Sequence, residues 1–149
     1  MTVMTESFGT AGKDLAKTCL VDLSMYKRTV KILESQAVRR LVESIIAQKI
    51  DQLVDLRTLT GSPVDSHMNS TNESSNSAEI DGIITEKWPN PESLLKDVTS
   101  RENAFAEAIR AVAIQAGSDE HRNALNACAE RSRKFASWTQ DHLDLLSLF

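Results

Sequence analysis

The chain has 149 residues, of which 41% are apolar and 26% are charged, and this is the balance of one globular domain. Its net charge of -4 at pH 7 argues against a nucleic-acid-binding surface, because phosphate binding needs an excess of Lys and Arg on one face. No run of apolar residues approaches the ~18 needed to span a bilayer, so a membrane is not expected as a partner. Gly, Pro and aromatic residues are scarce, which favours helix over strand.

The first predicted helix covers residues 13–34 and follows a flexible leader over residues 1–12. The leader carries an acid and glycines where a signal peptide would carry a basic and then an apolar stretch. The apolar residues of the helix recur at spacings of three and four, which places them on one face. These residues are Leu15, Cys19, Leu23, Tyr26, Val30 and Leu33.

The second predicted helix covers residues 37–59, and the Gly-Ser-Pro segment at 61–63 ends it. Its apolar stripe is wider than that of the first helix. The stripe consists of Val38, Leu41, Val42, Ile45, Ile46, Ile50, Leu53 and Leu56. Residues 61–78 are rich in Ser, Asn and Thr and cannot bury enough apolar surface to offset the entropy of ordering. We therefore predict a mobile crossover loop, which extends to residue 87.

The third predicted helix opens at Asn90 and Pro91, a capping residue followed by proline at the first helical position, and it ends at Gly117. The fourth opens at Ser118, is followed by acids at the positive end of the helix dipole, and continues to the C-terminus. Because the connections within each pair of helices are short, each pair is expected to form an antiparallel hairpin. The predicted fold is all-α, with one antiparallel four-helix bundle over residues 13–149.

Polar residues interrupt each apolar stripe near its middle, where a bundle usually holds its chemistry. Two interpretations are open, because the rotation of a helix cannot be fixed from sequence to better than a residue or two. The residues form a polar site inside the bundle, or they lie at the stripe edges with their polar ends in water. They are Cys19, Asp22, Gln48, Lys49, Asp51, Arg101, Glu102, Glu130, Arg131, Ser132 and Arg133.

Cys19 and Cys128 lie far apart in the sequence and lack the CxxC spacing or histidine partner of a metal site. Two free thiols within helices suit a reducing compartment, so a cytoplasmic protein is expected. A disulfide between them is the alternative if the first and fourth helices are neighbours.

The order of the helices, with a long crossover after the second, resembles the rubrerythrin branch of the ferritin-like superfamily. Cys19 precedes Tyr26 by seven residues, where that family places a metal-binding Glu before a Tyr. Gln48 and Asp51 stand at the Glu-x-x-His spacing of the family's second helix, and the Leu-rich segment LVDLRTL follows them.

In the second half of the chain, Glu102 or the neighbouring Arg101 matches the family's third-helix carboxylate position. Glu130 and Arg133 stand at the Glu-x-x-His spacing of the fourth helix, with Arg in place of the histidine. The resemblance spans residues 13–147 and implies a ferritin-like bundle. A di-iron site needs four carboxylates and two histidines, and only Glu102 and Glu130 remain as ligands of that set. We therefore expect a degenerate member of the superfamily without a metal or other cofactor.

The three histidines do not indicate catalysis. His67 lies in the polar loop, His121 in the first turn of the fourth helix and His142 near the C-terminus. The sequence has no Ser-His-Asp order, phosphate-binding glycine loop or HExxH motif, so no catalytic residue is expected.

These observations predict a non-catalytic helical bundle of ferritin-like ancestry that acts through protein contacts as a homodimer, with an unidentified protein partner. The dimer is expected because the second helix carries more apolar positions than one packing face requires. The alternative is a metal-binding or oxidoreductase protein of the same superfamily with an atypical carboxylate site, whose oxygen ligands would favour Mg, Ca or Mn over iron. The residues of that alternative site are Asp22, Asp51, Glu102 and Glu130.

Overall fold

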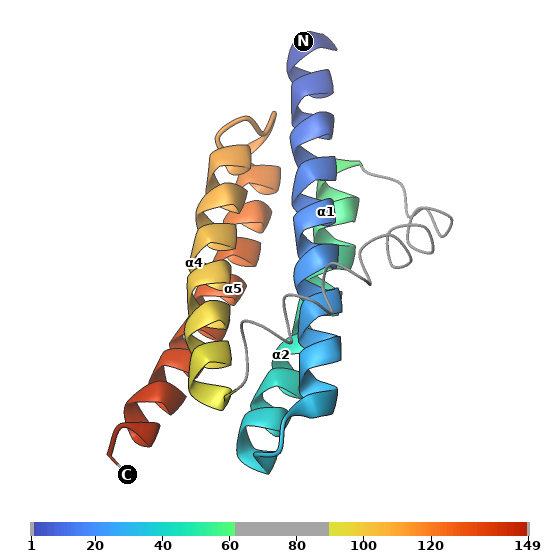
Figure 1. Cartoon of the computed structure of the whole chain (residues 1–149). Helices are drawn as coiled ribbons and strands as arrows, with labels where there is room; N and C mark the ends of the chain where they lie inside the picture. Colours follow the sequence, from blue (N-terminus) through green and yellow to red (C-terminus); the bar gives the residue numbers. More distant parts are fainter. Residues whose placement is uncertain (1, 62–89, 149) are drawn as a thin grey trace.

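The computed structural model describes residues 2–61 and 90–148, and within them it contains four helices and no strand (Figure 1). The helices are α1 (Thr2–Ile32), α2 (Gln36–Thr60), α4 (Pro91–Ala113) and α5 (Asp119–Leu146). The expectation of an all-α fold with four helices is therefore confirmed for residues 2–61 and 90–148. The crossover loop predicted for residues 61–87 lies outside the described residues, apart from Gly61.

Polar caps set the starts of three helices. The side chain of Ser35 accepts a hydrogen bond from the backbone N–H of the third residue after it, and Asn90 and Ser118 do the same at α4 and α5. The predicted starts at Asn90 and Ser118 are thus confirmed. Gly61, with a φ of 71°, ends α2 in the left-handed conformation that glycine adopts without strain. The helix α4 ends at Ala113, one turn before the predicted end at Gly117.

The start of α1 differs from the expectation, because this helix begins at Thr2 and includes residues 2–12, which were expected to belong to a flexible leader. The glycines in this segment are poor helix formers, and they suggested a non-helical leader. Tertiary packing of this segment outweighs the low helix propensity of its glycines. Phe8 packs against the apolar core, and Gly12 lies so close to Thr60 that a Cβ atom at Gly12 would stand 2.5 Å from the Thr60 Oγ1.

The helices pack as a bundle in which α1 contacts α2 and α4, and α5 contacts α4 and α2. Figure 1 shows the α1–α2 pair beside the α4–α5 pair. All four helices contribute to one apolar core, with Tyr26, Phe105 and Phe135 among its largest buried side chains. Within the described residues, no helix is long and apolar enough to cross a membrane.

The wide apolar stripe of α2 has a simple explanation in this arrangement. Because α2 borders both α1 and α5, it buries apolar residues on two sides. Of its large apolar side chains, Ile50 and Val54 are left exposed, at 39% and 53% of their surface. The sequence-based argument for a dimer through α2 therefore rests on these two residues alone.

Candidate functional site

Polar side chains from all four helices meet in the middle of the bundle. We call this group the interior polar layer. It comprises Asp22 and Tyr26 of α1, Lys49 and Gln52 of α2, Arg101 and Glu102 of α4, and Ser132 of α5. Except for the half-buried Arg101, these residues are buried. Of the polar residues that the sequence singled out, the interior interpretation therefore holds for Asp22, Lys49, Arg101, Glu102 and Ser132, whereas Asp51, Glu130, Arg131 and Arg133 are exposed.

Glu102 lies at the centre of the layer and is fully buried. Its Oε1 accepts a hydrogen bond from the Lys49 Nζ at 3.0 Å, and its Oε2 accepts one from the Tyr26 hydroxyl at 2.7 Å. The Lys49 ammonium also lies 4.2 Å from the centroid of the Phe105 ring, a favourable site for a cation. Burial, together with the charge of Glu102, raises the pKa of Tyr26 well above its ordinary value, so this hydroxyl remains a donor. Both carboxylate oxygens of Glu102 are thus occupied by donors from the chain itself.

Asp22 forms the second ion pair of the layer. Its Oδ1 lies 3.2 Å from Nη1 of Arg101, and Arg101 Nε donates to Asp97 Oδ2 at 2.6 Å. Burial raises the pKa of Asp22 to about 6, and the charge of Glu102 raises it as well, while Lys49 and Arg101 lower it. The aspartate is therefore held in its charged form less firmly than an exposed aspartate would be.

Gln52 connects α2 to α5. Its Nε2 donates to the backbone carbonyl of Cys128 at 2.8 Å and to the Ser132 hydroxyl at 2.7 Å. Its Oε1 is buried and has no hydrogen-bond partner among the described residues. An unpaired buried acceptor costs on the order of 1–3 kcal/mol, so the link that Gln52 makes between α2 and α5 comes with a loss of stability.

The two cysteines are free thiols, and both are buried. Burial raises the pKa of Cys19 to about 12 and that of Cys128 to about 11. Reactive thiols need the opposite shift, because the thiolate is the nucleophile. Neither cysteine is therefore suited to nucleophilic catalysis.

The four carboxylates of the alternative metal site do not come together. Asp22 and Glu102 lie inside the bundle, where each pairs with a cation of the chain. Asp51 and Glu130 are exposed, and Glu130 forms an ion pair with Arg110. The prediction that placed the last two residues in the interior is corrected.

The correction follows from a rotation of about 100° for each residue along a helix. The inward pair of α2 is Lys49 and Gln52, one residue after the predicted Gln48 and Asp51. On α5 the inward pair is Ala129 and Ser132, one residue before Glu130 and Arg133. An error of one residue moves a side chain from the interior to the surface.

Gln52 was missed by sequence reasoning, and Lys49 was noted without an assigned role. A signal for both was present, because positions 45, 49, 52 and 56 follow the three-and-four spacing of the α2 stripe. Their polarity hid this signal, because polar side chains are expected at the edge of an apolar stripe with their polar ends in water. The opposite charges of Lys49 and Glu102 explain how the structure accommodates both in the core.

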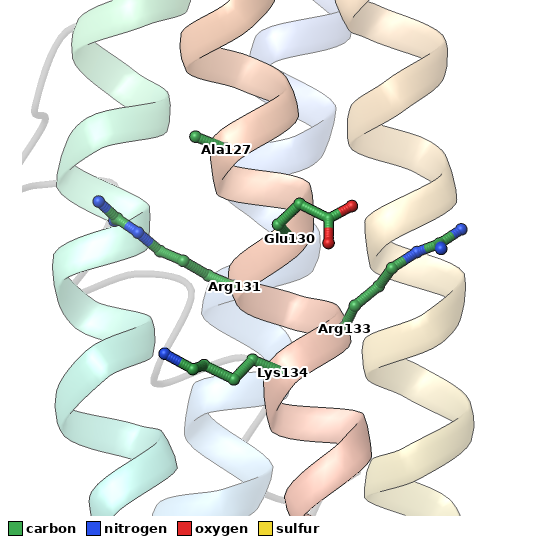
Figure 2. A pocket seen from close by; sticks show the side chains of 5 residues that line it. All are labelled: Ala127, Glu130, Arg131, Arg133 and Lys134. Atoms are coloured by element: carbon green, nitrogen blue, oxygen red, sulfur yellow. The ribbon is translucent and has the colours of Figure 1, made fainter.

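A shallow concavity of about 470 Å³ lies on the outer face of α5. Figure 2 shows its lining residues, with Arg131 extending toward α2 and Arg133 toward α4. Arg131 pairs with Asp55 at 2.6 Å, and Arg133 pairs with Glu107 at 2.6 Å. Both arginines that line the concavity therefore already have carboxylate partners.

The geometry defines an interior layer of paired charges and an outer surface of exposed ion pairs. Within the described residues, no group of three His, Cys, Asp or Glu side chains is placed to hold a metal ion. Comparisons with protein-family models, with curated proteins and with solved structures found no match to this chain.

Proposed function

We propose that the protein is a non-catalytic, antiparallel four-helix bundle of ferritin-like ancestry that acts in the cytoplasm through protein contacts, as a homodimer. The ancestry rests on the sequence resemblance. The position of the polar layer, midway along α2, α4 and α5, supports it, because ferritin-like proteins bind their metals in the middle of the bundle.

The observation that carries the proposal is the state of Glu102. Each oxygen of Glu102 already accepts a hydrogen bond, one from Lys49 and one from Tyr26, so a metal ion at this carboxylate would have to compete with both donors. The Lys49 ammonium supplies a positive charge inside the bundle, and a metal ion in the same layer would be repelled by it. The ion pair thus takes the structural place of a metal centre.

The alternative, a metal site built from carboxylates, gains no support from the geometry. Two of its four residues, Asp51 and Glu130, lie on the surface. The other two would first have to give up Arg101 and Lys49 as partners. We therefore do not propose metal binding or an oxidoreductase activity.

Two further observations bear on the cellular setting and the mode of action. Both cysteines are buried free thiols, which suits a reducing compartment. Large apolar side chains stay exposed on α2 and near the end of α5, and such residues are common in contact surfaces between subunits. Both observations support a cytoplasmic protein whose role is association.

Metal content tests the proposal directly. The protein should be expressed in medium supplemented with iron and manganese and analysed for transition metals after purification. We expect well below one ion per chain, and no oxidation of ferrous iron above the rate in buffer. The same measurements on Glu102→Ala are the matched control, because this variant removes the only fully buried carboxylate of the layer.

A different result would favour the alternative. One or more tightly bound transition-metal ions per chain, lost in Glu102→Ala but retained in the surface variant Glu130→Ala, would show that the interior binds metal. The proposed non-catalytic role would then be abandoned.

A further inference from the structure

The outer flank of α5 carries a continuous strip of exposed or half-exposed side chains. Its members recur at alternating spacings of four and three residues, the spacing that lets two helices pack along a common seam. We call it the α5 strip. It consists of Ala127, Arg131, Lys134, Trp138, Asp141 and Leu145.

The strip carries charges of opposite sign on the two sides of Trp138. Lys134 lies four residues before this tryptophan, and Asp141 lies three residues after it. Among the described residues, neither Lys134 nor Asp141 belongs to a salt bridge, although the Lys134 Nζ lies 5.7 Å from the centroid of the Trp138 ring. One end of the strip is therefore basic and the other acidic.

The two ends of the strip also differ in shape, and the two shapes are complementary. The concavity described above surrounds Arg131, seven residues before Trp138. Leu145 lies seven residues after Trp138, and 55% of its surface is exposed. Leu148, in the turn that follows α5, is 76% exposed. The strip thus has a hollow at one end and protruding apolar side chains at the other.

We infer that the α5 strip is the surface through which two copies of this chain associate, with their α5 helices antiparallel and the two-fold axis near Trp138. In this register Lys134 of one copy faces Asp141 of the second copy, and the concavity receives Leu145. A two-fold axis makes each of these contacts twice, which is the property of a self-complementary surface. The half-buried Trp138, already packed against Phe135 with ring centroids 5.9 Å apart, supplies a rigid aromatic centre.

This inference rests on the proposed homodimer and specifies its surface. The competing surface is the exposed face of α2 with Ile50 and Val54. That face lacks a basic residue and an acidic residue placed symmetrically about an aromatic centre. We therefore assign the contact to α5 rather than to α2.

Charge reversal and its rescue test the assignment. Molar mass should be measured by light scattering and sedimentation equilibrium for the wild type, Lys134→Glu, Asp141→Lys and the double variant. Both substituted positions are exposed, so circular dichroism is expected to show unchanged helix content. We expect a dimeric wild type and a rise in the Kd of the dimer of about ten-fold or more in each single variant. The double variant should have a Kd within about three-fold of wild type, because reversal of both charges restores two opposite-charge pairs.

Val54→Glu distinguishes the two surfaces. If Val54→Glu dissociates the wild-type dimer and neither Lys134→Glu nor Asp141→Lys affects it, the α5 assignment is overturned. The proposed homodimer would then remain intact. A wild type that stays monomeric at all accessible concentrations would overturn both the α5 assignment and the homodimer.

Discussion

Asp22 is a buried carboxyl group, and its surroundings shift its pKa in two opposite directions. Burial raises its pKa, whereas the nearby cations Lys49 and Arg101 lower it. The net result, a pKa of about 6 against an ordinary value of 3.8, shows that burial outweighs the ion pairs. At neutral pH the Asp22 carboxylate is therefore charged in the folded protein, although its buried environment favours the neutral carboxylic acid.

This shift predicts an unusual pH dependence of stability. Because the pKa of Asp22 is higher in the folded than in the unfolded protein, its stabilising contribution is complete below about pH 4 and is lost as the pH rises through 6. The free energy of unfolding of wild type minus that of Asp22→Asn should fall by ~2 kcal/mol between pH 4 and pH 7. Urea unfolding across this range measures the difference, and Asp51→Asn serves as the control for loss of a surface carboxylate. A difference that rises with pH would show that the ion pair with Arg101 outweighs burial.

At the scale of the helices, close packing between α1 and α2 depends on a glycine. Gly12 permits α1 to approach Thr60 at the end of α2, where a Cβ atom would collide with the threonine side chain. Gly9 lies in the same helix, and a Cβ atom there would meet nothing within 4 Å. The two glycines therefore differ in tertiary environment while sharing the same low helix propensity.

We expect opposite effects from the same substitution at these two positions. Gly9→Ala should stabilise the protein by about 0.5–1 kcal/mol, because alanine is the better helix former and nothing must move. Gly12→Ala should destabilise it by about 1–3 kcal/mol, because overpacking displaces Thr60 or separates the helices. Thermal and urea unfolding of both variants provide the comparison. Equal stabilisation by both substitutions would contradict the close approach of α1 and α2.

The sequence allowed three of the four helix starts to be predicted within a residue or two, because apolar periodicity and capping residues are local signals. The start of α1 was missed, since the contact of Gly12 with Thr60 joins residues that are distant in the sequence. The same limit applied to the site. Asp22 and Glu102 were identified as interior candidates, but Lys49 and Gln52 replaced Gln48 and Asp51, because helix rotation depends on tertiary packing.

At the scale of the whole molecule, the helix pair α1–α2 is joined to the pair α4–α5 through the interior polar layer. Lys49 and Tyr26 of the first pair bind Glu102 of the second, and Gln52 binds Ser132. Buried ion pairs add little net stability compared with apolar packing, but the loss of one partner is costly. The layer is therefore suited to fixing how the two pairs of helices pack against each other.

A double-mutant cycle on Lys49 and Glu102 measures this link most directly, with the exposed pair Arg133 and Glu107 as its control. Lys49→Met and Glu102→Gln should each cost about 3–5 kcal/mol, because each leaves a buried charge without its counterion. The double variant should cost little more than one single variant, which gives a coupling of at least ~2 kcal/mol, against less than ~1 kcal/mol for Arg133→Met with Glu107→Gln. Additive losses at Lys49 and Glu102, with no greater coupling than in the surface pair, would contradict an interior held together by this ion pair.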